Sequence, residues 1–387
     1  MRISVIGGGR WARTIAAVLC GLPHRSDRIT LHSPSNFSGL AAWVAQPRFH
    51  GRLQAAEVWP PFRAGPDRPE AVIVANRVDQ HFAAAASALS AGMPVLVEKP
   101  VSPWVRHVKE LGDIASAHAS VLAASHVFLF ARYFEAYAEA AAALGEPRSL
   151  RFVWTDGAAD VVRGEAKSYD AAVTVFDDVL PHILPMIGRL QFRDCTLCSM
   201  DVRRGGARLE IGLQSGARPV SLLVARNDDG RRRLIEIVTD NGVATLDFAN
   251  EPGTIATSHE RRNGDPLWDT VPRPLATMLT AFLAAAEGGP LDPRLSPALA
   301  TASASLAGAM RGAYIEHQVR WLEQRLGAPL DSSLHYALAE LSGEGRGDGD
   351  TVSAAWSGIK DSVALRSFLS GSPLWSETES GQVTGDL

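Results

Sequence analysis

The chain has 387 residues, too many for one ordinary hydrophobic core, so we expect two domains. Apolar residues make up 46% and charged residues 21%, as in average globular proteins. The net charge of -4 gives no basic field for nucleic acid. No segment reaches the ~18 consecutive apolar residues of a membrane span, and the N-terminus has no signal-peptide pattern. We therefore expect a cytoplasmic protein that binds neither nucleic acid nor membrane.

The first strand, turn and helix form a pattern suited to a dinucleotide. Residues 3–6 are a β-branched run, a glycine cluster follows, and apolar residues with helical spacing begin at Trp11. The pattern Gly7-x-Gly9-x-x-Ala12 therefore follows a strand and opens a helix. Gly7 permits the tight turn, Gly9 lets the backbone approach a pyrophosphate, and Ala12 lets the helix pack closely. The first helical turn, with Arg10 and Trp11, offers free N–H groups to the anion.

The second strand, residues 28–32, predicts which nicotinamide dinucleotide binds. An acidic residue at its end would bind the ribose 2′-hydroxyl of NAD, but Ser33-Pro34-Ser35-Asn36 stands there. The hydroxyls of Ser33 and Ser35 can hydrogen-bond a 2′-phosphate, and no carboxylate repels it. The sequence therefore favours NADP(H) over NAD(H). The alternative is that this loop contacts no phosphate and discriminates poorly.

Further alternating units complete the first domain. Continuous apolar runs predict buried parallel strands at residues 70–76, 94–97 and 120–125. Helical patterns at residues 80–91 and 103–117 separate them. Repeated strand–helix units with short connections predict an α/β Rossmann domain, a doubly wound parallel sheet, over residues 1–124.

Two segments then resemble a known family. Asn76-Arg77-Val78-Asp79-Gln80-His81, followed by a strand ending in Glu98-Lys99-Pro100, is similar to the Gfo/Idh/MocA oxidoreductases, relatives of glucose–fructose oxidoreductase and inositol dehydrogenase. That family commonly has Pro-Asn where Arg77-Val78 stands. The resemblance implies cofactor contacts for Asn76, Arg77, His81, Glu98 and Lys99. It also places Lys99 near the substrate carbonyl, where an ammonium can stabilise a developing alkoxide; without the pattern, Lys99 would be an ordinary solvated lysine.

A second candidate site lies in the other half of the chain. Asp178 and His182 are four residues apart within a predicted helix over residues 176–187, so they share one face. A carboxylate beside an imidazole orients it and raises its pKa, which suits proton transfer near neutral pH. The segment resembles the family's Asp-x-Gly-x-His motif, with Leu180 for glycine and Pro185 for a carboxylate that often follows. The alternative is a helix-capping aspartate and a core histidine.

The remaining chain predicts an α+β domain over residues 125–330. Strand patterns occur at residues 150–154, 195–202, 208–213, 220–225, 233–239 and 243–248, with a hairpin signal at Asn241-Gly242. Helices are expected at residues 274–287 and 296–326. The resemblance implies an open, mainly antiparallel sheet through which copies assemble as dimers or tetramers. Residues 331–387 are expected to be a partly flexible extension.

The sequence thus predicts an NAD(P)-dependent oxidoreductase without a metal. It would transfer hydride between the nicotinamide and a C=O, CH–OH or C=N group of a small polar metabolite, sugar-like or biosynthetic, with Lys99, His182 and Asp178 as catalytic residues. Two alternatives stay open. One is an imine reductase of a natural-product or siderophore pathway; the other is a non-catalytic, NADP-binding regulator on the same fold.

Overall fold

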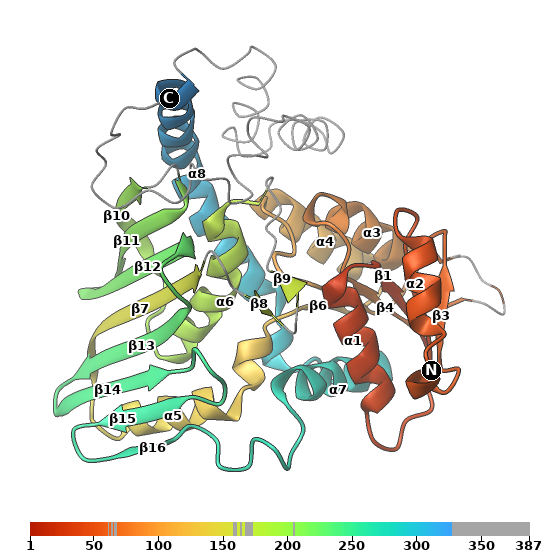
Figure 1. Cartoon of the computed structure of the whole chain (residues 1–387), viewed down its shortest axis with the longest axis horizontal. Coiled ribbons are helices and arrows are strands. Elements are labelled where there is room, and N and C mark those ends of the chain that lie inside the picture. The colour runs from red at the N-terminus through yellow and green to blue at the C-terminus, as the bar shows by residue number, and fades with distance from the viewer. Residues whose placement is uncertain are drawn as a thin grey trace. The chain divides into compact units, whose positions relative to one another are not determined.

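The computed structural model describes residues 1–326 apart from 61, 63–64, 66–67, 158–160, 163–164, 167–172 and 204–205 (Figure 1). The predicted extension at 331–387 lies outside these residues. The described residues form two compact units, the first within residues 1–131 and 268–304 and the second within residues 132–267 and 305–326. Both predicted layers are present: an NAD(P)-binding Rossmann sheet in the first unit and a mainly antiparallel sheet in the second.

The first unit is built on a six-stranded sheet with all strands parallel. The strand order is β3-β2-β1-β4-β5-β6, comprising β1 (Arg2–Ile6), β2 (Arg28–His32), β3 (Leu53–Ala56), β4 (Ala71–Val74), β5 (Val95–Val97) and β6 (Leu122–Ala124). The connecting helices are α1 (Arg10–Gly21), α2 (Phe37–Val44), α3 (Val78–Ser90) and α4 (Val105–Ala117). Every residue of β4 and β5 is buried, as expected of strands covered on both faces.

A later segment of the chain completes this unit. Helix α7 (Pro274–Ala286) buries Met278, Leu279 and Phe282 in the same apolar cluster as Ile3 and Val5 of β1. Residues 268–304 therefore belong with the Rossmann sheet, which differs from a simple division of the chain at residue 124. No local sequence pattern predicts that α7 packs on the first sheet, because this packing depends on which face of that sheet is left uncovered by the other helices.

The second unit is built on an eight-stranded sheet of order β10-β11-β12-β7-β13-β14-β15-β16. Its strands are β7 (Pro147–Gly157), β10 (Thr196–Arg203), β11 (Arg208–Ser215), β12 (Arg218–Asp228), β13 (Arg232–Thr239), β14 (Gly242–Asp247), β15 (Thr254–Thr257) and β16 (Arg261–Asn263). All neighbouring pairs are antiparallel except β12 with β7. The predicted hairpin at residue 242 is present between β13 and β14.

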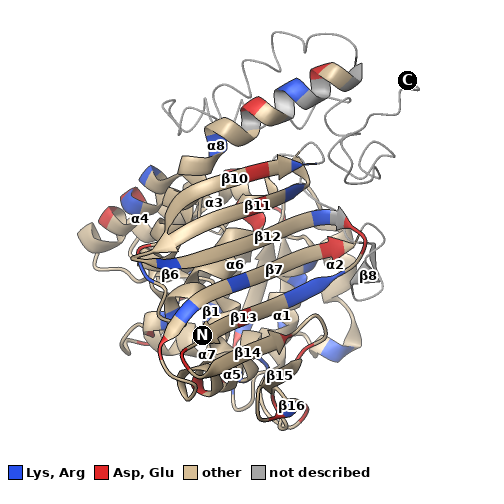
Figure 2. Cartoon of the chain, turned by 90° about the vertical axis from the view of Figure 1, so that its left-hand side faces the viewer, with Lys and Arg blue, Asp and Glu red and all other residues tan. Residues whose placement is uncertain are grey.

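One face of this sheet is apolar and carries helices. Alternation along β7 and β13 places Leu150 and Phe152 opposite Ile237 and Ile235, all buried. Helices α5 (Arg132–Ala142) and α6 (Val175–Arg189) lie on this inner face, as the stacking of Trp154 in β7 on an α6 side chain shows. Figure 2 shows the opposite, outer face, which no described helix of this unit covers.

A buried ion pair joins the last helix to α6. Arg311 of α8 (Pro297–Leu326) donates to the two carboxylate oxygens of Asp177 at 2.7 and 2.8 Å, with both side chains 1% exposed. Thr174 also donates to Asp177, at 2.8 Å. Bidentate geometry and this extra hydrogen bond offset the desolvation of two charges, so the start of α6 is held in place.

Among the described helices, none is long and apolar enough to span a bilayer.

Candidate functional site

The loops of the first unit converge because its strands are parallel. The segments that follow β1, β2, β4 and β5 leave the same edge of the sheet, and they contain every cofactor residue predicted from the sequence. The chain runs outward from β1 to β3 on one side and from β4 to β6 on the other. Ligands of open α/β sheets bind where the strand order reverses in this way, here between β1 and β4.

The glycine turn after β1 meets the requirements of a pyrophosphate site. Gly7 has φ of 141°, and a Cβ there would lie 2.4 Å from the carbonyl oxygen of Ala75, so only glycine fits. Gly9 precedes the first residue of α1, and a Cβ there would meet nothing within 4 Å. The space beside Gly9 and the free N–H groups at Arg10 and Trp11 suit an anion, and the first turn of α1 has no acidic residue. Ala12 is buried against the sheet as predicted.

The two serines after β2 have different surroundings. Ser33 is 5% exposed, and its Oγ lies 2.4 Å from where a Cβ of Gly8 would stand, so Ser33 packs beneath the glycine turn. Ser35 is exposed, whereas Asn36 donates from Nδ2 to the Gly8 carbonyl oxygen at 3.1 Å. Of the two predicted phosphate contacts, Ser35 therefore has the accessible hydroxyl. Ser33 and Asn36 shape the loop.

The loop after β4 is fixed by short-range contacts. Arg77 pairs with Asp79 at 2.6 Å, so its guanidinium folds back on its own helix, α3. His81 is buried, with Nδ1 at 2.9 Å from the Pro100 carbonyl oxygen and Nε2 at 3.2 Å from that of Asn76. Burial lowers the pKa of His81 below its usual range. His81 therefore joins two loops of the site, and its effect on a cofactor would pass through Asn76.

Glu98 and Lys99 follow β5 at the same edge. Glu98 is buried, and Trp11 and Ser125 lie within hydrogen-bonding reach of its carboxyl group. Burial raises the pKa of Glu98 above its usual range. The neighbouring Lys99 is half-buried, and its backbone N–H donates to Glu98 Oε2 at 3.3 Å. Glu98 thus connects the start of α1 with the loop that carries Lys99.

Helix α6 of the second unit carries the other candidate residues. Asp178 and His182 are half-buried, whereas the residues between them, Val179 to Pro181, are buried. Thr174 caps the helix by accepting from the N–H of Asp177, so Asp178 is not the capping residue. The imidazole of His182 stacks on Trp154 with ring centroids 5.3 Å apart and planes at 15°. The two side chains therefore share one partly open face, as their spacing predicts.

Charged residues that the sequence reading missed lie beside His182. The guanidinium carbon of Arg233 in β13 is 3.9 Å from the Trp154 ring centroid, and Arg233 is 2% exposed. Arg233 also donates to Asp156 of β7, and Asp178 lies close enough to act on its charge. Burial lowers the pKa of Arg233. The available sequence signal was the end of apolar alternation at Trp154-Thr155-Asp156 and at Arg231-Arg232-Arg233.

The predicted catalytic residues come from both units. Lys99 belongs to the first, and Asp178 and His182 belong to the second. The described residues contain no group of three or more His, Cys, Asp or Glu side chains that could hold a metal ion. The first unit has the glycine turn, and the second carries Asp178 and His182 on one face of α6. The turn at this place in a Rossmann sheet is typical of nicotinamide-dependent oxidoreductases.

Comparison with known proteins agrees with this class. Residues 1–126 match the family model of the Gfo/Idh/MocA proteins, described as an oxidoreductase family with an NAD-binding Rossmann fold. The Rossmann domain is therefore similar to this NAD-binding oxidoreductase family, as the sequence motifs predicted, and the match supports an NAD(P)-dependent oxidoreductase. No curated protein matches the chain.

Solved structures show the same fold over most of the chain. The UDP-N-acetylglucosamine 3-dehydrogenase of Acidithiobacillus ferrooxidans is 20% identical, with a TM-score of 0.61 over 79% of this chain and 95% of that one. The 3-ketoreductase KijD10 of Actinomadura kijaniata, in complex with NADP and TDP-benzene, is 18% identical, with a TM-score of 0.65 over 80% and 96%. At these identities the likeness shows the fold.

The two glycines of the turn should respond differently to alanine. Gly9→Ala adds a methyl group where nothing meets it, so the free energy of unfolding should stay within about 0.5 kcal/mol of wild type. NADPH affinity should fall about tenfold or more, because the methyl group obstructs the phosphate approach and its charge-assisted hydrogen bonds. Gly7→Ala should instead cost stability by about 1–3 kcal/mol, through strain and the Ala75 contact. Urea unfolding and fluorescence titration measure both, and unchanged NADPH affinity in Gly9→Ala would remove the pyrophosphate assignment.

Proposed function

We propose that this protein transfers hydride between NADP(H) and a C=O or CH–OH group of a small polar metabolite. The observation that carries the proposal is the pairing of the Gly7–Gly9 turn with Glu98-Lys99 at one edge of the Rossmann sheet. The turn suits the pyrophosphate, and Lys99 is a partly accessible cation two strands away. One protein with a similar fold is named for a reaction on UDP-N-acetylglucosamine and another is a 3-ketoreductase, which supports a sugar-like or biosynthetic substrate here.

The proposed roles follow from the surroundings of each residue. The bound cofactor would supply or accept the hydride at its nicotinamide. The Lys99 ammonium would hydrogen-bond the substrate oxygen and stabilise its negative charge as the bond order changes. His182 would exchange a proton with the substrate, with Asp178 orienting the imidazole. Trp154, stacked on His182, limits the rotation of the ring.

The preference for NADP(H) rests on the end of β2. Residues 33–36 contain no carboxylate, and α2, which follows, has no acidic residue in its first turn. The exposed Ser35 hydroxyl and the start of this helix favour a 2′-phosphate over a bare hydroxyl. The KijD10 structure contains NADP, which is consistent with the same preference.

Two other functions would use the same fold. Reduction of a C=N bond, as in an imine reductase of a natural-product or siderophore pathway, needs the same hydride donor and a proton donor, so His182 and Asp178 fit it as well. A non-catalytic regulator would need only the cofactor site. The joint presence of Lys99, Asp178 and His182 favours an enzyme, and a cytoplasmic location remains our expectation.

Lys99→Ala should separate catalysis from binding. The turnover rate should fall by about 10²-fold or more, because the oxygen loses its charged hydrogen-bond donor. NADPH affinity should change much less, since the pyrophosphate site is intact. The measurement is NADPH oxidation over keto-sugars, keto acids and cyclic imines, together with fluorescence titration. Lys109→Ala, at an exposed site on α4, is the matched control. Near-wild-type turnover in Lys99→Ala would reject the catalytic assignment.

Cofactor preference gives a second test. Wild type should bind NADPH more tightly than NADH in fluorescence titration. Ser35→Asp should lower NADPH affinity by about tenfold, because a carboxylate repels the 2′-phosphate and can accept from a 2′-hydroxyl. Ser116→Asp, which adds the same charge at an exposed site on α4, should leave both affinities unchanged. Equal affinities of wild type for the two cofactors would contradict the preference.

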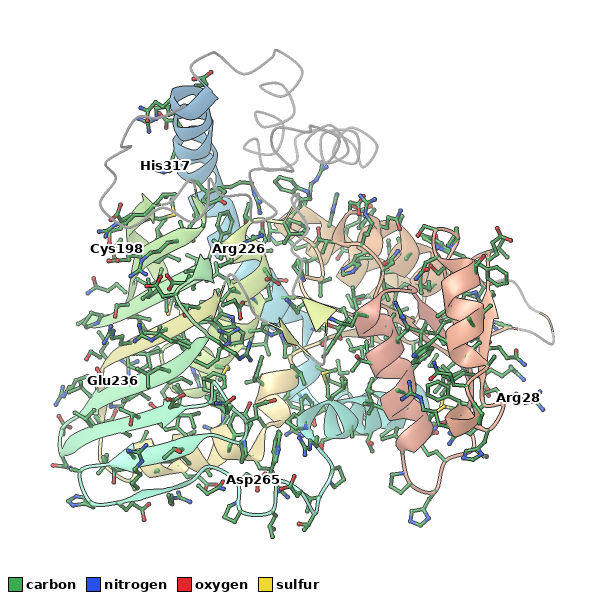
Figure 3. All side chains as sticks on the ribbon, in the orientation of Figure 1. Arg28, Cys198, Arg226, Glu236, Asp265 and His317 are labelled. Atoms are coloured by element: carbon green, nitrogen blue, oxygen red, sulfur yellow. The ribbon has the colours of Figure 1, made fainter. Side chains whose placement is uncertain are left out.

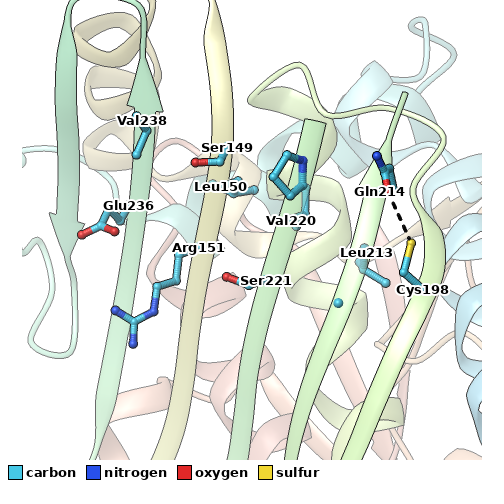
Figure 4. A pocket seen from close by; sticks show the side chains of 12 residues that line it. Ser149, Leu150, Arg151, Cys198, Leu213, Gln214, Val220, Ser221, Glu236 and Val238 are labelled. Atoms are coloured by element: carbon cyan, nitrogen blue, oxygen red, sulfur yellow. Dashed lines mark hydrogen bonds between the residues drawn. The ribbon is translucent and has the colours of Figure 1, made fainter. Parts of the chain in front are cut away.

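We also propose that dimers or tetramers form through the outer face of the second unit's sheet. This face presents Arg151 of β7 beside Glu236 of β13, and it holds a shallow cavity of about 470 Å³ between these strands and Cys198 of β10 (Figures 3 and 4). The directly paired Val238 and Val243 are 37% and 40% exposed on the same face. Neighbouring opposite charges and exposed apolar pairs suit a self-complementary contact.

Light scattering tests this assembly. The wild-type mass should exceed that of one chain, and Val238→Arg should lower it by placing a charge in the apolar part of the contact. Val58→Arg, at a site 71% exposed in the first unit, should leave the mass unchanged. A wild-type protein that is monomeric at micromolar concentration, or a Val238→Arg protein of unchanged mass, would count against this interface.

A further inference from the structure

The inner face of the second sheet changes character along two neighbouring strands. Leu150 and Phe152 of β7 pair with Ile237 and Ile235 of β13, all apolar and buried. The same register continues with Trp154 opposite Arg233, and just beyond this pair Asp156 accepts a hydrogen bond from the Arg231 side chain. We call Trp154, Asp156, Arg231 and Arg233 the charged row. Burying charges on a core face is costly, so a row of this kind indicates a polar surface with a use.

Arg233 holds the row together through several contacts. It stacks on Trp154, donates to Asp156, and donates to the carbonyl oxygens of Thr155 and Arg232 at 2.5 and 2.8 Å. A desolvated cation–π contact and buried hydrogen bonds leave this side chain little freedom. Arg233 therefore fixes Trp154 and Asp156, and at 2% exposed its side chain is buried away from a ligand.

Arg231 is held by the same carboxylate and remains open. Its Nη1 donates to Asp156 Oδ1 at 3.2 Å, and its Nε donates to the Ala249 carbonyl oxygen at 3.0 Å. The side chain is nevertheless 39% exposed, and Nη2 makes no hydrogen bond to any described residue. Two hydrogen bonds fix the planar guanidinium while one edge stays available, which is a preorganised donor for an anion.

The open edge belongs to the same cluster as the proposed acid–base pair. Trp154 contacts both the His182 ring and the Arg233 guanidinium, while Asp156 contacts both arginines. Asp178 acts on the charge of Arg233. Tyr133 lies near this cluster, because the charge of Arg231 affects the pKa of its hydroxyl. That hydroxyl donates to Glu251 Oε1 at 2.5 Å. A substrate that reaches His182 would therefore meet Arg231 with its Nη2 unoccupied.

We propose that Arg231 binds an anionic oxygen group of the substrate, a carboxylate or a phosphate, so that the enzyme acts on acidic metabolites in preference to neutral ones. This inference rests on the proposed function, which supplies the site, but its test measures ligand binding and not turnover. A guanidinium presents parallel donors that match either group, and its charge is permanent.

Titration calorimetry without added cofactor tests this binding directly, since no hydride transfer takes place. The probes are D-glucuronate, glucose 6-phosphate and glucose, which share a ring and differ in the anionic group. Wild type should bind at least one anionic probe about tenfold or more tightly than glucose, the size expected of a charge-assisted hydrogen bond. Preference for glucuronate identifies a carboxylate, and preference for glucose 6-phosphate identifies a phosphate.

Matched variants assign the preference to Arg231. Arg231→Gln should lose it, whereas Arg232→Gln, the adjacent and exposed arginine on the other sheet face, should keep it. Arg231→Lys keeps the charge and should retain part of it, even if the glutamine variant does not fold. Equal binding of all three probes by wild type, or an unchanged preference in Arg231→Gln, overturns the proposal. Lys99→Ala should keep the preference while losing turnover, so failure of the proposed reaction and failure of this inference are distinguishable.

Discussion

The close approach of two parallel strands at Gly7 is the constraint on which the cofactor site depends. With the Ala75 carbonyl oxygen 2.4 Å from any Cβ at position 7, the turn after β1 can exist only with glycine. The chain leaves β1 toward β2 and returns at β4 on the other side, so this contact marks the point where the strand order reverses. The open space at Gly9, the packed hydroxyl of Ser33 and the Asn36 bond to Gly8 follow from holding that turn. A binding site for an anion is thus produced by backbone geometry before any side chain contributes.

The second unit differs from the first because it holds charged side chains in fixed positions inside an apolar layer. Two buried pairs do this: Arg311 with Asp177 holds the start of α6, and Arg233 with Asp156 holds the ends of β7 and β13. Each costs desolvation, and each is compensated by further hydrogen bonds. Asp178 and His182 lie between these two pairs. They are half-buried polar side chains in the first two turns of α6, and they follow the buried Asp177. Rigidity around these two residues is what acid–base chemistry requires.

Features that depend on local pattern were predictable from the sequence, and those that depend on long-range packing were not. The glycine turn, the buried strands and the shared face of Asp178 and His182 follow from spacing alone, and the structure confirms the fold they imply. The burial of Ser33 depends on Gly8, and the return of α7 depends on an uncovered face of the first sheet. The charged row was visible only as a break in alternation, because pairing Asp156 with two arginines needs the register between β7 and β13.

The departures of this chain from the family motif bear on what it binds. Pro185 is buried in α6 and provides no carboxylate where relatives of the sugar-oxidising type often have one. Asp156 is a nearby carboxylate, and its Oδ1 accepts from both Arg231 and Arg233. The polar group held near His182 through Trp154 and Arg233 is therefore the Arg231 guanidinium, a hydrogen-bond donor. The hydride-transfer step does not depend on these side chains, since the cofactor would supply or accept the hydride. Substrate choice does depend on these side chains, and a fixed guanidinium donor is the feature on which our proposal of an anionic substrate rests.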